Sequence, residues 1–134
     1  SGRAGVRVAR LSNVVGPGMD ERSGNLVADL VRQARQGVMV LRSHPSSVKD
    51  YIHIDDVVQW LPLIALGGKF ATYNVASGVQ TTHTQWLEWL QARTGCAMQV
   101  TESAPLQHFP PIDVHRLQME WGVLPRTVLT EALL

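Results

Sequence analysis

Short apolar runs alternate with longer, amphipathic segments along the whole chain. The short runs are rich in β-branched residues and are bounded by glycine or polar residues, as is typical of strands. They cover residues 6–11, 38–41, 48–54, 72–76 and 97–101. The segments between them carry apolar residues three and four positions apart, which predicts helices. Strands that alternate with helices from end to end predict an α/β domain.

Two of the predicted helices differ in how their apolar residues are arranged. A helix over residues 25–36 is apolar on one face only. The next helix runs to about Leu66, and we expect Asp55 or Asp56 to cap its start. This second helix is apolar on nearly all sides, so it should be buried between layers, and Pro62 should kink it or shorten its start.

A capping box marks the start of a third helix. Thr82 and Gln85 have the required spacing, and His83 between them is expected to be exposed. Two further helices are predicted, one over residues 113–121 capped by Asp113 and one from Thr127 to the end of the chain.

Composition excludes several functional classes. The 134 residues are 45% hydrophobic, which suits one domain with a core. The 12 basic and 11 acidic residues leave a formal charge of +1, so nucleic acid is not an expected partner. No apolar run reaches the roughly 20 residues of a membrane span, and the first residues lack the apolar centre of a signal peptide. Cys96 is alone, which favours a buried thiol and a reducing, cytoplasmic location.

Several catalytic signatures are missing from the sequence. It has no glycine-rich dinucleotide turn, no Walker loop and no nucleophile elbow. Neither Tyr51 nor Tyr73 has a lysine four residues later, so we assign no catalytic residue. His53 and Asp55 would share one strand face and could form part of a metal site. A strand end followed by a helix cap is the simpler interpretation, so no metal site is predicted.

Motifs in a fixed order carry a family resemblance. Residues 10–18 (RLSNVVGPG) are similar to the motif R-x-x-N-x-Y-G-P-G, and residues 49–57 (KDYIHIDDV) to R-D-Y/F-I-H-V-x-D-V. Further matches are residues 25–26 (NL), 73–78 (YNVASG), 113–117 (DVHRL) and 121–125 (WGVLP). From Val6 to Leu134 the chain thus resembles the NAD(P)-dependent epimerase/dehydratases of the extended short-chain dehydrogenase/reductase family, which act on nucleotide-sugars.

The resemblance implies the C-terminal portion of a Rossmann-type fold, with the last sheet strands and a small substrate-binding subdomain. Residues 1–134 then form one incomplete domain. Residues 5–16 and 54–78 resemble the Rossmann part, and 24–53 and 95–134 the subdomain. The family's glycine fingerprint and Tyr/Lys pair belong to an N-terminal half that is missing here. The parent protein would use NAD or NADP, whereas this fragment alone is expected to bind neither.

Three expected ligand contacts follow from matched positions near two strand ends. Asn13 matches a residue that contacts the substrate diphosphate, and Ser12 matches a neighbour that touches the cofactor. Lys49 stands where the family has an arginine that grips a phosphate. Asn13 has the alternative role of satisfying the turn at Gly16, and Lys49 that of a solvated strand residue.

Further substrate contacts are implied at a helix start and a strand. Asn25 and Leu26 match the helix start that meets the nucleotide diphosphate, where free N–H groups favour an anion. Asn25 could equally be only a helix cap. Met39, Val40 and Leu41 match the strand whose edge meets the base.

Departures from the family pattern leave alternatives open. Lys49 offers a point charge in place of a bidentate fork, Val15 replaces a tyrosine, and residues 104–111 lack the usual arginine. Our first hypothesis is the substrate-binding part of an oxidoreductase whose partners are a nucleotide-sugar and the missing N-terminal half. The second is a non-catalytic binding or assembly module, and the third an independent small α/β binding protein. A homodimer is open to each of them.

Overall fold

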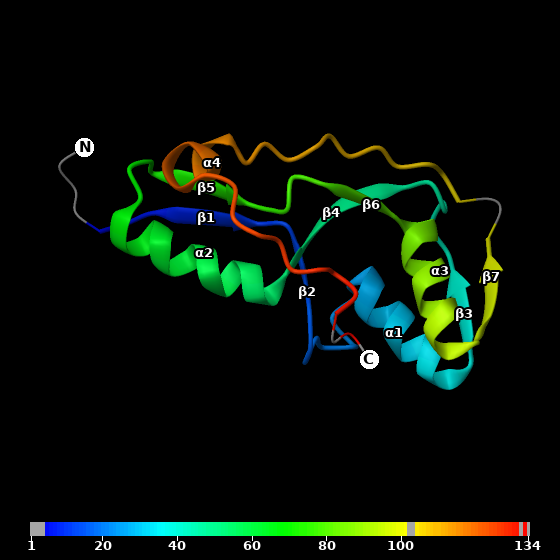
Figure 1. The fold of residues 1–134 in the computed structure, drawn as a ribbon. Helices are drawn as coiled ribbons and strands as arrows, with labels where there is room; N and C mark the ends of the chain where they lie inside the picture. The colour runs from blue at the N-terminus through cyan, green and yellow to red at the C-terminus, as the bar shows by residue number, and fades with distance from the viewer. Residues whose placement is uncertain (1–4, 102–103, 132, 134) are drawn as a thin grey trace.

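Parallel strand pairs form both ends of an elongated molecule (Figure 1). The computed structural model describes residues 5–101, 104–131 and 133, so residues 1–4 and their expected lack of a signal peptide lie outside it. The parallel pairs are β1 (Val8–Leu11) with β5 (Thr72–Val75), and β3 (Val38–Leu41) with β7 (Ala97–Val100). Between them, β4 (Val48–His53) pairs in parallel with β2 (Asn13–Val15) and antiparallel with β6 (Gln80–Thr82).

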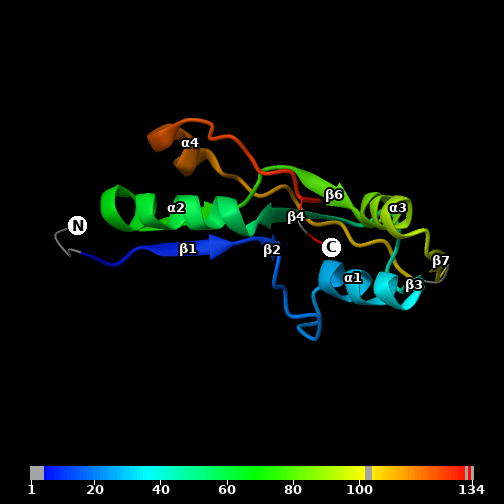
Figure 2. The same cartoon turned by 60° about the horizontal axis from the view of Figure 1, so that its bottom comes forward.

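Each end has its own apolar cluster. At one end α1 (Leu26–Gln36) and α3 (His83–Thr94) pack with β3, and this first cluster includes Cys96, which is buried as predicted. At the other end α2 (Ile54–Gly67) and α4 (His115–Trp121) pack with β1 and β5 to form the second cluster. Figure 2 shows the two helix pairs well separated along the molecule. The α/β prediction is confirmed.

The start of α3 confirms one prediction and corrects another. Thr82 and Gln85 make both hydrogen bonds of the capping box. His83, however, is only 3% exposed. Its backbone N–H donates to the Ser47 carbonyl at 3.0 Å and its ring Nδ1 lies 2.7 Å from the Ser43 hydroxyl, so the residue is turned into the protein.

Helix α2 differs from its prediction at the cap and on its outer face. His53 is the cap, and its Nδ1 accepts from the Asp55 N–H at 3.1 Å. Val58 and Leu66 are 61% and 89% exposed, so the prediction of burial on all sides is wrong for the described chain. Pro62 lies inside a continuous helix and does not shorten its start.

The last predicted helix is also wrong over the described residues. A turn replaces it, because Thr127 donates both its backbone N–H and its hydroxyl to the Asp56 carboxylate. The tail then reaches the first cluster, where Leu133 is buried. No helix in the described ranges is long and apolar enough to cross a membrane.

Residues 104–114 run the length of the molecule toward α4 (Figure 1). Side chains of the neighbouring strands hold this segment. The Gln80 amide donates to the Phe109 carbonyl at 2.7 Å, and the Asn74 amide donates to the Asp113 carbonyl at 2.9 Å. Asp113 does not cap α4 as predicted, because Val114 is the cap residue and no side chain caps this helix. The Asp113 side chain instead accepts from the N–H of His115, the first residue of α4, at 2.8 Å.

Candidate functional site

A buried carboxylate gathers several strand ends at the centre of the molecule. Asp50 of β4 is 4% exposed. It accepts from the Ser12 hydroxyl at 2.8 Å, the Ser77 N–H at 3.0 Å and the Gly78 N–H at 2.8 Å. The ends of β1 and β5 are therefore fixed to β4 by one side chain. Sequence reasoning did not single out Asp50, although it lies inside the matched segment 49–57.

The Asn13 side chain contacts the backbone of Asp50. Its Nδ2 donates to the Asp50 carbonyl at 3.0 Å, so this amide does not serve the turn at Gly16. The Asn13 Oδ1 receives no hydrogen bond from the described part of the chain. Ser12 and Asn13 are thus brought together, and the Asn13 oxygen is left free to accept from a ligand.

Lys49 points the other way. Consecutive residues of a strand face opposite sides, so Lys49 and Asp50 lie on different faces of β4. The Lys49 ammonium sits 5.2 Å from the centroid of the Phe109 ring. The structure therefore does not place the Lys49 side chain beside Ser12, although Ser12 bonds to Asp50, the next residue along β4.

The start of α1 has a well-formed cap. The Asn25 side chain accepts from the N–H groups of Val27 at 2.9 Å and Ala28 at 3.3 Å. Leu26 packs against the first cluster. Asn25 therefore has the structural role that the sequence allowed, and its helix start remains a proposed contact for a diphosphate.

The strand predicted to meet the base is mostly internal. Met39 and Leu41 are fully buried in the first cluster. Val40 is half-buried, and its N–H donates to the Gln33 side chain at 2.6 Å. Of the three, only Val40 has a side chain that could touch a ligand from this face.

Three buried polar atoms lie near Lys49 and β4. The Tyr51 hydroxyl, His83 Nε2 and Trp86 Nε1 have no hydrogen-bond partner among the described residues. Burial raises the pKa of Tyr51 to about 12. Burial, and then the charge of Lys49, lower the pKa of His83 below its usual 6.5. Both side chains are therefore uncharged near neutral pH, and neither is suited to release a proton there.

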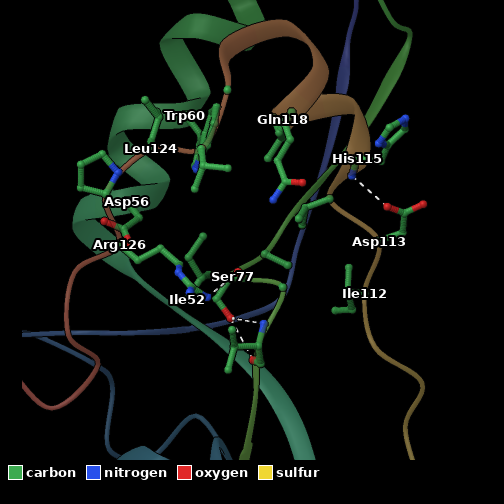
Figure 3. Close-up of a pocket in the computed structure, with 18 residues that line it drawn as sticks. Ile52, Asp56, Trp60, Ser77, Ile112, Asp113, His115, Gln118, Leu124 and Arg126 are labelled. Carbon is green, nitrogen blue, oxygen red and sulfur yellow. Dashed lines mark hydrogen bonds between the residues drawn. The ribbon is translucent and has the colours of Figure 1, made fainter.

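A separate cavity of about 390 Å³ opens beside the end of β5 (Figure 3). Its polar lining includes Asp56, Ser77, Gln118 and Arg126, and an indole, Trp60, forms part of its apolar wall. None of the residues predicted as ligand contacts lines it. The lining comes from four segments that are distant in the sequence. Each includes residues of a matched motif (residues 49–57, 73–78, 113–117 and 121–125), but the motifs did not show that these segments meet.

Comparison with known proteins identifies the relatives of this fold. The family model for the NAD-dependent epimerase/dehydratase family matches residues 2–76. No curated protein matches the sequence. Solved structures that match include TunA, an NAD-dependent NDP-hexosamine 5,6-dehydratase of tunicamycin biosynthesis, with a TM-score of 0.81 and 21% identity over 96% of this chain and 43% of that one.

Two further structures show the same relation. The dTDP-glucose 4,6-dehydratase from Bacillus anthracis matches with a TM-score of 0.78 and 20% identity over 96% of this chain and 42% of that one. The UDP-glucose 4-epimerase from Thermotoga maritima matches with a TM-score of 0.76 and 26% identity over 95% of this chain and 43% of that one. The chain therefore spans less than half the length of each of these structures.

Proposed function

Because the chain belongs to the NAD-dependent epimerase/dehydratase family, we propose that it is the substrate-binding part of a nucleotide-sugar oxidoreductase. The whole protein would oxidise a sugar hydroxyl transiently by hydride transfer to NAD or NADP. This chain would hold the nucleotide-sugar in place, and the chemistry would belong to residues outside it.

The observation that carries the proposal is the placement of Asn13. It follows the carboxyl end of β1, and ligands of open α/β sheets bind outside the carboxyl ends of the strands. Its amide is fixed on the Asp50 carbonyl, so its oxygen is held in one direction. We propose that Asn13 contacts the substrate next to the diphosphate. The further proposed contacts are the helix start at Asn25 and Leu26, the Lys49 ammonium, and the strand from Met39 to Leu41 through its backbone edge and the Val40 side chain.

Binding of the cofactor requires a glycine-rich turn, which this chain does not contain. Dinucleotides are held by a glycine-rich turn that presents the N–H groups of a helix start to the pyrophosphate. The sequence has no such turn. Ser12, the proposed cofactor neighbour, already donates its hydroxyl to Asp50. We therefore propose that NAD or NADP is bound chiefly by a missing N-terminal half, whose sheet would continue beside β1.

Calorimetry tests this division of labour. UDP-glucose and dTDP-glucose should bind the whole protein, and Asn13→Asp should weaken binding about tenfold because a carboxylate repels the diphosphate. Gln59→Glu is the matched control, since it makes the same amide-to-acid change at an exposed position of α2. Micromolar binding of NAD by the 134-residue chain alone would contradict the proposal.

A non-catalytic binding or assembly module is the second candidate. Residues 104–111 contain no arginine to clamp a diphosphate, and Lys49 lies over the Phe109 ring. The sequence of the proposed N-terminal half distinguishes the two candidates. A Tyr/Lys catalytic pair in that half would contradict the non-catalytic candidate. For either candidate we propose a cytoplasmic protein, in keeping with its single cysteine, and a homodimer as the assembly to test.

A further inference from the structure

We propose that the cavity beside β5 binds a neutral, hydroxyl-rich molecule of about monosaccharide size. The cavity measures about 390 Å³, and small-molecule sites occupy about 300–1,000 Å³. It lies outside the carboxyl end of β5, between α2 and α4 (Figure 3). This site is distinct from the proposed nucleotide-sugar contacts, because none of those residues lines it.

Part of the cavity lining, contributed by both α2 and α4, is apolar and firmly packed. Trp60 is 8% exposed and Leu117 is 1% exposed, and both belong to the second cluster. The Trp121 ring lies 6.1 Å from that of Trp60 and keeps the indole in place. A rigid indole beside aliphatic side chains suits the C–H face of a sugar ring, which is the least polar surface of such a molecule.

Hydrogen-bonding groups that the protein leaves unused also line the cavity. The Gln118 amide points into the cavity (Figure 3) and has no side-chain partner among the described residues. It provides a donor and an acceptor together. Arg126 donates through Nη1 to the Ser77 carbonyl at 3.0 Å, which fixes the guanidinium while its other nitrogens have no acceptor in the described chain.

Charge decides between ligand classes. The charged lining consists of one arginine, Arg126, and two aspartates, Asp56 and Asp113, beside one histidine, His115. The hydrogen bonds of Asp56 all come from Thr127, so its carboxylate is not paired with a cation. A phosphate would face two carboxylates and a cation would face the guanidinium. A neutral molecule with several hydroxyl groups can bond to all three without either penalty.

Saturation-transfer NMR on the 134-residue chain tests the proposal, with D-glucose and myo-inositol as probes and inorganic phosphate as the charged comparison. We expect saturable binding of at least one neutral probe and none of phosphate. Gln118→Ala should weaken that binding about tenfold through the lost hydrogen bonds. Val79→Trp should block it, because Val79 lines the cavity and is 48% exposed, so it can accept a larger side chain.

Gln59→Ala, an exposed amide of α2 outside the cavity, is the matched control and should leave binding unchanged. Melting curves establish that each variant is folded. The proposal is overturned if neither neutral probe saturates, if phosphate binds in their place, or if Gln118→Ala and Val79→Trp both bind like the parent chain. Asn13→Asp should leave glucose or inositol binding intact, so failure here is distinguishable from failure of the nucleotide-sugar proposal.

Discussion

The Asp50 side chain connects three strands of the molecule, β1, β4 and β5. Its carboxylate receives hydrogen bonds from three residues, Ser12, Ser77 and Gly78, that lie far from it in the sequence. Asp50→Asn would turn part of that acceptor into a donor facing other donors. We expect the free energy of unfolding to fall by about 2–4 kcal/mol, the cost of leaving buried polar groups unpaired.

Urea denaturation measures this change. Glu88→Gln on the exposed side of α3 is the control, and it should alter the free energy of unfolding by less than about 0.5 kcal/mol. Equal effects of the two substitutions would show that the hydrogen bonds to Asp50 contribute no special stability.

His83 makes stability depend on pH in a defined direction. Its pKa is lowered from 6.5 in the folded protein, first by burial and then by the charge of Lys49. Above pH 6.5 the ring is neutral in both the folded and unfolded chains. Below that value the unfolded chain binds a proton that the folded chain resists, so stability falls until the pH reaches the lowered pKa and then levels off.

The comparison is between the parent chain and His83→Gln, with urea denaturation at about pH 7.5 and about pH 5.5. The variant should lose less stability between the two values, because it has no ring to protonate. If both proteins lose the same amount, other groups cause the acid sensitivity.

Among the helices and strands, those whose positions depend on local sequence were predicted correctly. The strands β3, β5 and β7, and the amphipathic helices α1 and α3 with their caps, lie where their patterns placed them. The errors occur where a contact with a residue distant in the sequence determines the local structure. His53 caps α2 because the helix begins at Ile54, so Asp55 and Asp56 lie inside its first turn, where Asp56 bonds to Thr127. The same contact replaces the predicted last helix by a turn.

The relative placement of the proposed site residues was predictable only in part. Motifs identified Ser12 and Asn13, and the structure does bring them to one point. The same reasoning could not show that Lys49 lies away from Ser12, because the strand pairing decides which face of β4 meets Ser12. It could not find the cavity beside β5 either, because α2, α4 and the tail meet there only after folding.

Pro62 gives a prediction for one helix. It lies in the interior of α2 and is exposed, so it removes a backbone hydrogen bond and gains no burial. Pro62→Ala should raise the free energy of unfolding by about 1–3 kcal/mol. Thermal and urea unfolding measure the gain, with Gln59→Ala on the same helix as a control of near-zero effect. A loss of stability would mean that the proline ring makes a contact that the helix needs.

For the whole molecule, the tail and the long strands connect two clusters that would otherwise be independent. Ile52 of β4 belongs to the second cluster and Tyr51, its neighbour, to the first. The tail adds a second link, from Asp56 through Thr127 to Leu133. Loss of packing at one end is therefore transmitted to the other, and we expect the described chain to unfold as one unit.

Exposed apolar side chains on α2 and β1 predict how the 134-residue chain behaves alone. Val58, Leu66 and Val8 are 61%, 89% and 50% exposed, and β1 has only β5 as a sheet neighbour in the described chain. Exposed apolar surface next to an open strand edge favours association. Sedimentation velocity should show a mass that rises with protein concentration.

The double variant Val58→Lys and Leu66→Glu should weaken this association about tenfold or more. Burial of each replaced apolar side chain would otherwise stabilise the complex by about 1.5–3 kcal/mol. Gln59→Lys is the control for added charge. A chain that stays monomeric at every concentration would show that this face is stable in water, and would remove one reason to expect a further part of the family fold against it.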